Sequence, residues 1–398
     1  MLDLIVVTHP ERLGSLSMPR FAGMIVDGMR ERGHRAEIWR PVDCLSASSM
    51  ARGGMRKWLG YADDYLLFPR VLQYGLLRLR KEGRQPMVVC ADQALGMLVP
   101  SFRDMPHVIH CHDFLAQRSA LGEFGENPTG WSGRIYQKLI RRGYRRGGAF
   151  LSISEATQQD LHRFLGSAPE FSEVVYNGLN AHYAPMEREE AWSVFRPHAG
   201  EDVRAILHVG GNQWYKNRAG AVAIYQALFE RDPNPPVLWM IGPPPSEALK
   251  ALIAGHDSAR HIRFFHDLSG EEMRAAYSLA EVFLFPSLEE GFGWPPLEAM
   301  ACGTPVLTTE KAPMTEVCGD AAQYIPRQPT GGQADQRDWL DTCVNALTSM
   351  LGADDQKREA WKRAGLERAA LFSNKKALDG YEAAYQEVFD RWKTSHRP

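Results

Sequence analysis

The stretch from residue 281 to 309, EVFLFPSLEEGFGWPPLEAMACGTPVLTT, constrains the fold more than any other part of this chain. Residues 282–285 form a short apolar run that predicts a buried strand. A glycine-bearing loop follows, and Pro295 and Pro296 suit the first turn of a helix. A second apolar run at 306–309 predicts another strand. The unit is therefore strand, loop, helix and strand, which is typical of a parallel sheet.

Two glutamates flank this loop. Glu290 lies on the loop, and Glu298 lies in the first turn of the predicted helix. In a parallel sheet such a loop sits at the carboxyl end of a strand, beside backbone N–H groups of the helix start, where ligands usually bind. Carboxylates accept from hydroxyl groups, so the pair can hold a hydroxyl-rich ligand. The alternative is that Glu298 complements the helix dipole and Glu290 is a solvated loop residue.

The same alternation recurs along the chain and predicts an α/β fold. A strand at 4–7 precedes a loop with Gly14 and Ser15, and a strand at 205–209 precedes Gly210, Gly211 and Lys216. A lysine where a glycine loop opens a helix is well placed to meet a diphosphate. Further strands are predicted at 87–90, 107–111, 150–154, 237–241, 262–265 and 321–325. Around residues 185–202 the sequence turns polar, and we place a linker there.

The string from Glu290 to Glu298 resembles the E-x7-E signature of the family 4 retaining glycosyltransferases of GT-B fold. The resemblance covers most of the chain and is strongest from about residue 205 to 325. It implies two Rossmann-like domains facing a cleft: an N-terminal, acceptor-side domain at 1–186 and a nucleotide-sugar-binding domain at 203–372. A C-terminal helix at about 375–398 crosses back to the first domain.

The resemblance also implies roles for individual residues. Glu290 and the amides of Gly291, Phe292 and Gly293 hold the donor sugar, and Glu298 binds the ribose. The loop with Gly14 and Ser15 closes over the donor phosphates, Lys216 meets the diphosphate, and His112 faces the sugar. Gly211 is a further expected donor-binding residue, and Gly211 or Asn212 occupies the region where the family usually has an arginine, which leaves Arg118 and Arg218 as candidate phosphate or acceptor contacts. The expected catalytic residues are His112, Lys216 and Glu290.

No metal and no cofactor are expected, with a nucleotide-diphosphate sugar as the substrate. His107, His110 and His112 lie close in sequence, but alternation along a strand puts His107 on the opposite face from the other two, so the three cannot meet one ion. No D-x-D motif stands where a metal-dependent sugar-nucleotide site needs one. A front-face reaction fits better than a double displacement, because no carboxylate nucleophile stands at the expected place.

Charge and composition restrict the partners. The first 186 residues hold 23 Lys and Arg against 18 Asp and Glu, whereas the whole chain has a net charge of −2. The basic clusters at 52–57, 78–84 and 141–146 can contact anionic lipid headgroups or can be solvated helix faces. No nucleic-acid recognition motif accompanies them. Scattered cysteines and the absence of a signal peptide or an apolar run of membrane-spanning length favour a cytoplasmic protein, peripheral at the inner face of the membrane.

Three functions therefore stand side by side. The first is a retaining glycosyltransferase that acts on a lipid-linked, polysaccharide or other glycan acceptor. The second is another GT-B enzyme, such as a nucleotide-sugar epimerase or a phosphorylase. The third is a non-catalytic sugar-nucleotide-binding or complex-forming subunit, because a fold does not by itself fix a function.

Overall fold

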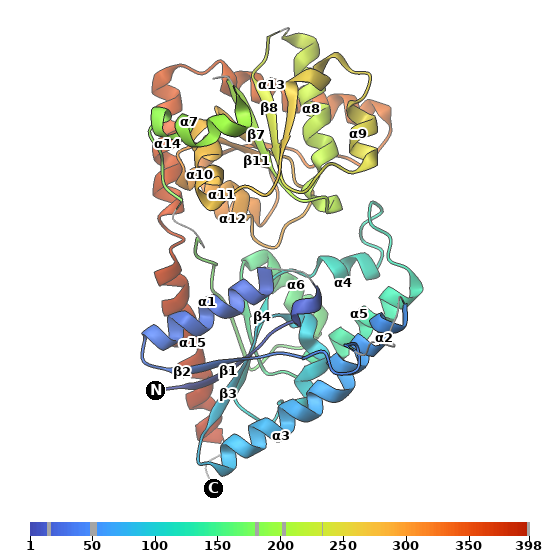
Figure 1. Ribbon diagram of the computed structural model, residues 1–398, viewed down its shortest axis with the longest axis vertical. Coiled ribbons are helices and arrows are strands. Elements are labelled where there is room, and N and C mark those ends of the chain that lie inside the picture. The colour runs from blue at the N-terminus through green and yellow to red at the C-terminus, as the bar shows by residue number, and fades with distance from the viewer. Residues whose placement is uncertain (14–16, 48–53, 180–182, 201–203, 233, 396–398) are drawn as a thin grey trace. The chain divides into compact units, whose positions relative to one another are not determined.

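A computed structural model describes residues 1–13, 17–47, 54–179, 183–200, 204–232 and 234–395 of the chain. Gly14 and Ser15, expected in the loop over the donor phosphates, lie outside the described residues, as does Arg52 of the first basic cluster. The chain separates into two compact units (Figure 1). The first comprises residues 1–124, 128–176 and 375–398, and the second comprises 125–127 and 177–374.

The described part of the first unit contains a six-stranded parallel sheet in the order β2-β1-β3-β4-β5-β6. The chain leaves β1 toward β2 on one side and later continues through β3 on the other, so the topological switch point lies between β1 and β3. The strands are β1 (Asp3–Val7), β2 (Arg35–Trp39), β3 (Pro86–Cys90), β4 (His107–Cys111), β5 (Ala149–Ser152) and β6 (Phe171–Val174).

Helices cover both faces of this sheet. One face packs against α1 (Ser17–Glu31) and α15 (Asn374–Ser395). The other face packs against α3, the 3-10 helix η3, α5 and α6. The remaining elements of the first unit are η1 (Glu11–Leu13), α2 (Gly54–Ala62), the π-helical turn η2 (Asp63–Leu67), α3 (Phe68–Lys81), η3 (Gln93–Ser101), α4 (Leu115–Ala120), α5 (Trp131–Tyr144) and α6 (Glu155–Leu165).

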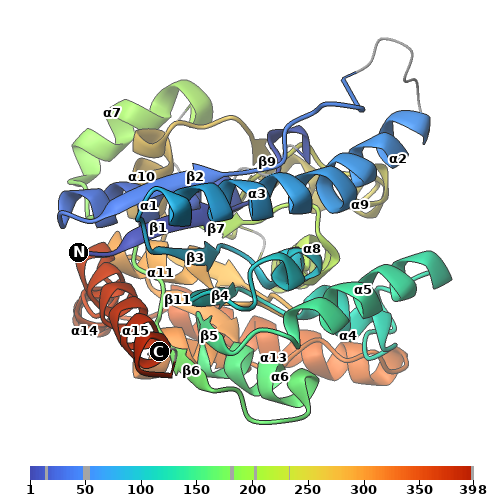
Figure 2. The ribbon, with the colours of Figure 1, turned by 90° about the horizontal axis from the view of Figure 1, so that it is seen from below.

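The C-terminal helix α15 returns to the first unit, as the sequence predicts. Leu378, Tyr381 and Tyr385 on its apolar stripe are buried in the same core as α1 and the first strand. The Tyr385 hydroxyl lies 2.6 Å from Nε2 of His110 on β4, which ties the helix to the sheet. Gly28 of α1 leaves room for Leu378, because a Cβ at residue 28 would lie 2.5 Å from the Leu378 side chain. Figure 2 shows α15 alongside the strands of this sheet.

The second unit also holds a six-stranded parallel sheet within its described residues, in the order β12-β11-β10-β7-β8-β9. One face packs against α8 (Arg218–Arg231), α9 (Glu247–Ile253) and α13 (Gln333–Leu351). The strands are β7 (Ala205–Val209), β8 (Val237–Ile241), β9 (Ile262–Phe265), β10 (Val282–Phe285), β11 (Val306–Thr309) and β12 (Ala322–Ile325). Each unit is thus a Rossmann-like α/β domain, which confirms the predicted fold class.

The longer helices of the second unit are α7 (Arg188–Ala199), α8 (Arg218–Arg231), α10 (Gly270–Leu279), α13 (Gln333–Leu351) and α14 (Asp355–Ala369). The shorter ones are η4 (Trp214–Lys216), α9 (Glu247–Ile253), η5 (Asp257–His261), α11 (Trp294–Ala301), α12 (Met314–Cys318) and η6 (Gly319–Ala321).

Helix α7 occupies the segment that we expected to be a linker. Ala191, Phe195 and Ala199 recur every four residues and are all buried. The ring of Phe195 lies 4.8 Å from that of Trp239 on β8. This spacing forms an apolar stripe that packs on the second unit, and the polar residues that suggested a linker occupy the outer face of the helix.

Candidate active site

The second unit presents its loops at the switch point between β7 and β10, which are neighbouring strands. The loop after β7 carries residues 210–217, and the loop after β10 carries residues 286–293. The two loops are hydrogen-bonded to each other: the Leu288 amide donates to the Tyr215 carbonyl at 2.7 Å, and Asn217 Nδ2 donates to the Pro286 carbonyl at 2.9 Å. Ligands of open α/β sheets bind at this kind of edge.

Backbone geometry fixes the loop after β7. Asn217 adopts the left-handed conformation with φ of 50°, and its side chain caps α8 by accepting from the Gly220 amide. The same side chain also donates to Gln328 Oε1 at 2.9 Å, so it ties three loops together. Gly242, with φ of 148°, lets the loop after β8 approach closely, because a Cβ there would lie 2.2 Å from the Gly210 carbonyl oxygen.

Lys216 and Glu290 meet where these two loops join. Lys216 Nζ lies 2.7 Å from Oε1 and 3.0 Å from Oε2 of Glu290. Ser287 Oγ also donates to Glu290 Oε1 at 2.7 Å. The two charged side chains are only 16% and 7% exposed. The structure thus brings together the cation and the carboxylate that the sequence analysis assigned to the diphosphate and to the sugar.

Glu289, the neighbour of Glu290, has a different environment. Its side chain is buried and pairs with Lys311, which follows β11. Arg327 Nε lies 3.5 Å from the same carboxylate and donates to the Leu288 carbonyl. Glu289 therefore holds the loop against the sheet, whereas Glu290 lies beside Lys216.

Glu298 is partly buried in the first turns of α11. Its carboxylate accepts a hydrogen bond from the Tyr277 hydroxyl at 2.9 Å and another from Tyr183. Burial raises the pKa of Glu298 to about 7, against the opposing effects of the Tyr277 hydrogen bond and the Lys216 charge. Glu298 therefore lies close enough to Lys216 to sense its charge, and the second unit gathers both motif glutamates around one lysine.

The glycine-rich part of the motif forms the start of α11. Gly293 is the N-cap with φ of 107°, a left-handed conformation that favours glycine. The Phe292 ring is buried and packs edge-on against Trp294 at 5.2 Å. Pro295 and Pro296 lack N–H groups, so backbone donors near this helix start come from Gly291 to Trp294. The buried phenyl ring anchors the segment that carries these amides.

Arg218 is the first residue of α8 and is 5% exposed. Its Nη1 donates to the Asn212 side chain and to the Pro243 carbonyl, the latter at 2.9 Å. Within the described residues, its Nε and Nη2 have no hydrogen-bond partner. Burial lowers the pKa of this guanidinium. Arg218 is thus a buried cation with two donors that have no partner in the described chain, on the helix that follows the loop with Gly211 and Asn212.

His208 on β7 is a residue that the sequence analysis missed. It is buried, its Nδ1 lies 3.0 Å from the Leu284 carbonyl of β10, and burial lowers its pKa to about 4. Its Nε2 has no partner in the described chain and faces Gly210, where a Cβ would lie 3.1 Å away. A lone histidine in an otherwise apolar strand next to a glycine loop was the available signal.

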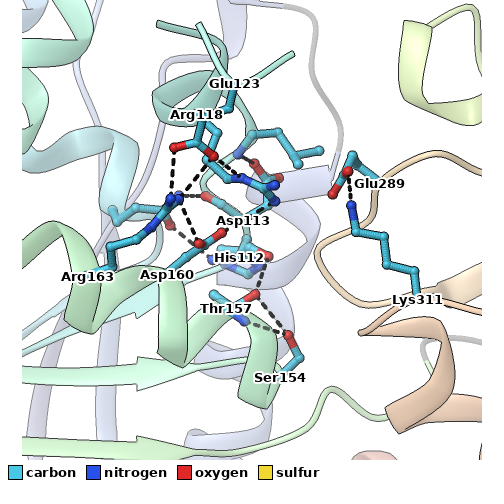
Figure 3. A network of polar contacts seen from close by, with 12 residues as sticks. His112, Asp113, Arg118, Glu123, Ser154, Thr157, Asp160, Arg163, Glu289 and Lys311 are labelled. Atoms are coloured by element: carbon cyan, nitrogen blue, oxygen red, sulfur yellow. Dashed lines mark hydrogen bonds and ion pairs between the residues drawn. The ribbon is translucent and has the colours of Figure 1, made fainter. Parts of the chain in front are cut away.

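In the first unit, His112 lies just after β4 and is largely buried. Its Nε2 lies 2.8 Å from the Ala91 carbonyl, its backbone amide donates to Gln93 Oε1 at 3.0 Å, and its ring meets Phe21 edge-on at 4.5 Å. Burial lowers its pKa, although the Asp92 charge acts in the opposite direction. A hollow of about 270 Å³ is lined by Ser17, Asp92, Gln93, His112, Asp113 and Gln117, among others. Figure 3 shows His112 and Asp113 within the polar network of this unit.

Asp92, at the end of β3, lies across the switch point of this sheet from His9, which follows β1. Their side chains are 2.9 Å apart. Burial opposes the ionisation of Asp92, but the hydrogen bond to His9 prevails and lowers the pKa of the carboxyl. His112 therefore belongs to a group of polar side chains at the carboxyl ends of β1, β3 and β4.

Arg118 is held by carboxylates of its own unit. Its Nε donates to Glu123 at 2.9 Å, and its Nη1 lies 3.7 Å from Asp160. The guanidinium also covers the Phe124 ring at 4.5 Å. Figure 3 shows this cluster together with Arg163, which binds the same glutamate. The structure therefore places Arg118 in a local ion-pair network.

The three histidines near β4 lie on two different faces of the sheet. His110 and His112 both contact Phe21, and His107 contacts Phe102 in the core on the other side of the sheet. This arrangement confirms the predicted alternation. Among the described residues, no three His, Cys, Asp or Glu side chains are grouped so that they could hold a metal ion.

Two family models match the chain. The model described as "Glycosyl transferases group 1" matches residues 193–368, and the "Glycosyl transferase 4-like domain" matches residues 18–178. Together they span most of both units. The chain belongs to the GT-B glycosyltransferases. The second model fits family 4, as the E-x7-E motif predicts.

Relatives of this GT-B protein carry the names of different glycosyltransferases. It is 26% identical over 242 residues to the O-antigen chain mannosyltransferase B of Escherichia coli. This match covers 60% of this chain and 61% of that protein. It is 25% identical over 307 residues to the D-inositol 3-phosphate glycosyltransferase of Corynebacterium diphtheriae. This match covers 74% of this chain and 68% of that protein. The chain thus aligns with about three fifths of the length of the E. coli relative.

Solved structures share the fold of this GT-B protein. Sucrose-phosphate synthase from Thermosynechococcus elongatus matches with a TM-score of 0.73 at 16% identity, over 98% of this chain and 100% of that one. WaaG, a glycosyltransferase involved in lipopolysaccharide biosynthesis, matches with a TM-score of 0.66 at 19% identity, over 95% of this chain and 99% of that one. Anabaena HepE in complex with UDP and glucose matches with a TM-score of 0.70 at 14% identity, over 97% of this chain and 100% of that one.

Among the described residues, none of the helices combines the length and the apolar character that crossing a bilayer requires.

Proposed function

We propose that this chain transfers a sugar from a nucleotide-diphosphate sugar to a hydroxyl of a lipid-linked, polysaccharide or other glycan acceptor, with retention of anomeric configuration. The observation that carries the proposal is the Lys216–Glu290 pair at the switch point of the second sheet, with Glu298 close by on the next helix. The names of the relatives, which include O-antigen mannosyltransferases, support a glycan acceptor. We further propose a cytoplasmic location with peripheral contact at the inner face of the membrane.

Each side chain then has a distinct task toward the donor. Glu290 accepts hydrogen bonds from hydroxyls of the sugar, helped by the amides of residues 291–293, and Glu298 accepts from the ribose hydroxyls. Lys216 neutralises the diphosphate. Arg218 supplies the second positive partner, because its buried guanidinium has two donors without partners in the described chain. His112 keeps the role that the motif resemblance gives it, toward the sugar.

The chemistry follows from this arrangement. As the bond between the anomeric carbon and the diphosphate oxygen breaks, negative charge develops on the leaving diphosphate, and a fixed cation stabilises it. The acceptor hydroxyl attacks from the same face and passes its proton to the leaving diphosphate oxygen. Since Lys216 and Arg218 supply the positive charge, the reaction requires neither a divalent metal nor a cofactor. The protein contributes position and charge.

A thermal-shift panel tests the donor site. UDP-, GDP- and ADP-sugars are compared on the wild type and on Glu298→Ala, because a ligand that binds only the folded state raises the melting temperature. Stabilisation by one nucleotide sugar that is lost in the variant supports the donor site and the ribose role of Glu298. No stabilisation by any of them contradicts the proposal and favours a subunit that does not use nucleotide sugars.

Two further measurements separate the enzymatic alternatives, and a third determines the stereochemistry of the transfer. Release of the nucleotide diphosphate that depends on a glycan acceptor, and that persists in EDTA, supports a metal-independent transferase. Conversion of the donor sugar without any acceptor would instead identify an epimerase-type enzyme. The anomeric configuration of the product, measured by NMR, decides whether the transfer is retaining.

A further inference from the structure

The first unit exposes an unusual number of large apolar side chains on neighbouring helices. The three most exposed aromatic residues are Trp131 at 77%, Tyr74 at 73% and Trp58 at 72%. We call this surface the docking face. Its apolar members lie on α2, η2, α3 and α5 and are Met55, Trp58, Leu66, Val71, Tyr74, Leu77, Trp131, Ile135 and Leu139.

These side chains are exposed although the helices that carry them are firmly packed. On α3, Val71, Tyr74 and Leu77 form one stripe at a spacing of three residues, while Phe68, Leu72, Leu76 and Leu79 face the core. The helix therefore has two apolar stripes, of which the protein core covers one. Folding of the first unit accounts for the inner stripe and leaves the outer one without a role.

Helix α5 repeats this arrangement. Trp131, Ile135 and Leu139 recur every four residues on the exposed side, and Ile140 and Tyr144 are buried. The inner side approaches η3 at glycine contacts, since a Cβ on Gly143 would lie 2.1 Å from the Gly96 carbonyl oxygen. Close backbone packing thus holds α5 in place and fixes the direction of its exposed stripe.

Aromatic contacts join α5 to α2 and to η2, and η2 runs directly into α3. The hydroxyls of Tyr65 on η2 and Tyr136 on α5 lie 2.7 Å apart, and the rings of Tyr61 and Tyr136 lie 5.9 Å apart. Figures 1 and 2 both place α2 and α5 at the same side of this unit. Beside α3 the apolar surface continues into a groove of about 540 Å³ that reaches the edge strand β2 and includes Trp39, Val42 and Leu67.

The exposed charges of the docking face are positive. In the described parts of α2, η2, α3 and α5, the acidic residues are Asp63 and Asp64, and both are buried. Asp63 accepts from the amides of Leu45 and Ser46, and Asp64 pairs with Arg12. Glu82, just past α3, lies 3.4 Å from Arg78. The exposed basic residues interleaved with the apolar ones are Arg56, Arg70, Arg78, Arg80, Lys81, Arg134, Lys138 and Arg142.

We propose that the docking face binds the surface of an anionic lipid bilayer. Aromatic side chains with a polar edge settle at the level of the headgroups, apolar ones enter the acyl boundary, and basic side chains between them pair with anionic headgroups. A second copy of the chain is a poorer partner, because a face-to-face pair would bring identical positive surfaces together. The assignment deepens the peripheral membrane contact of the proposed function and does not depend on sugar transfer.

Vesicle co-sedimentation of the full chain tests the assignment without any turnover. The probes are vesicles of phosphatidylcholine alone and of phosphatidylcholine mixed with phosphatidylglycerol. We expect at least about tenfold tighter binding to the anionic vesicles, and weaker binding as salt rises. The triple variants Trp58→Ser/Tyr74→Ser/Trp131→Ser and Arg70→Gln/Lys138→Gln/Arg142→Gln should each lose about tenfold in affinity for them.

The matched control is Leu252→Ser/Leu371→Ser, which removes two exposed leucines from the second unit and should bind like the wild type. Melting temperatures equal to that of the wild type establish that every variant is folded. Equal binding by the wild type and both triple variants, or no binding of the folded wild type to anionic vesicles, overturns the proposal. Lipid-free self-association that the apolar variant abolishes, without any change in vesicle binding, would assign the face to a second copy.

Discussion

Lys216 Nζ lies 2.7 Å from Oε1 of Glu290, although the two residues are 74 positions apart and come from loops after different strands. Both side chains are largely buried, and Ser287 Oγ donates to the same carboxylate oxygen. Removing one charge of a buried pair leaves the other uncompensated, which is costly. The pair therefore links the stability of these two loops to the chemistry that we propose for them.

Glu290→Gln should lower kcat by about 10²–10³-fold, the usual effect of removing one polar group that acts in the transition state. Glutamine keeps an oxygen for Ser287 and Lys216 but leaves the Lys216 charge uncompensated, so we also expect a lower melting temperature. Initial rates of nucleotide diphosphate release, measured with the donor that the thermal-shift panel identifies, check this. The matched control is Glu289→Gln, whose partners Lys311 and Arg327 hold the loop; it should lower the melting temperature more than Glu290→Gln does. A wild-type rate for Glu290→Gln would remove Glu290 from the catalytic set.

Glu298 should make donor binding depend on pH near neutrality. Burial raises its pKa to about 7, so the carboxylate that accepts from ribose hydroxyls is fully formed only above that pH. We expect the donor-induced shift in melting temperature to grow between about pH 6 and pH 8 in the wild type, and to be small and flat in Glu298→Gln. Thermal-shift titrations across this range measure it, and a wild-type shift that is independent of pH would contradict the role.

The raised pKa of Glu298 also predicts that the free energy of unfolding depends on pH in the absence of any ligand. Its pKa in the folded state lies above that of an unfolded glutamate, so the folded state binds the proton more tightly. The free energy of unfolding should therefore fall as pH rises from about 4.5 to about 7, and this contribution should be constant above that. Comparing the wild type with Glu298→Gln at each pH isolates this contribution from those of the histidines. A difference that does not change with pH would mean that the pKa of Glu298 is not raised.

Much of the second unit follows from sequence because its buried strands are continuous apolar runs between turn residues. Val282–Phe285 and Val306–Thr309 agree with the predicted bounds, and the segment between them holds both motif glutamates, Glu290 on the loop and Glu298 in α11. Gly211 and Lys216 lie on the loop after β7 as expected. A pattern of this kind specifies fold class and motif position because parallel strands are buried on both faces.

Other features depend on neighbours that a local pattern does not show. Strand β2 has charged Arg35 and Glu37 because it is an edge strand, so no apolar run marks it. The sequence does not predict helix α7, because only one narrow stripe of this helix is apolar. The pairing of Lys216 with Glu290, and the burial of Arg218 and His208, depend on how separate loops meet in space.

Arg218→Met should weaken donor binding more than it weakens folding. The guanidinium of Arg218 is buried with two donors that have no partner in the described chain, so an apolar side chain of similar length relieves a desolvation cost while removing a phosphate contact. We expect the donor Kd, measured by calorimetry, to rise by about tenfold or more, as loss of a charge-assisted hydrogen bond implies.

Arg231→Met is the matched control for that change. Arg231 lies at the other end of α8, is exposed and binds Asn345 and Asp341. Its loss should leave the donor Kd unchanged and alter stability by less than about 1 kcal/mol. If both arginine variants bind the donor like the wild type, Arg218 is not the second positive partner of the diphosphate.

Gly242→Ala should destabilise the second unit more than any other glycine-to-alanine change in the loops of that unit. The residue has φ of 148°, and its new Cβ would lie 2.2 Å from the Gly210 carbonyl oxygen, which is backbone and cannot rotate away. Backbone strain and this contact together should cost on the order of 3 kcal/mol in the free energy of unfolding. Because Gly210 begins the loop that carries Lys216, the donor-induced thermal shift should also fall.

The control is Gly270→Ala at the start of α10, where a Cβ meets no atom within 4 Å and helix propensity favours alanine by up to about 1 kcal/mol. Urea unfolding of both variants checks the difference, and equal stability would mean that the loops after β7 and β8 can move apart without cost.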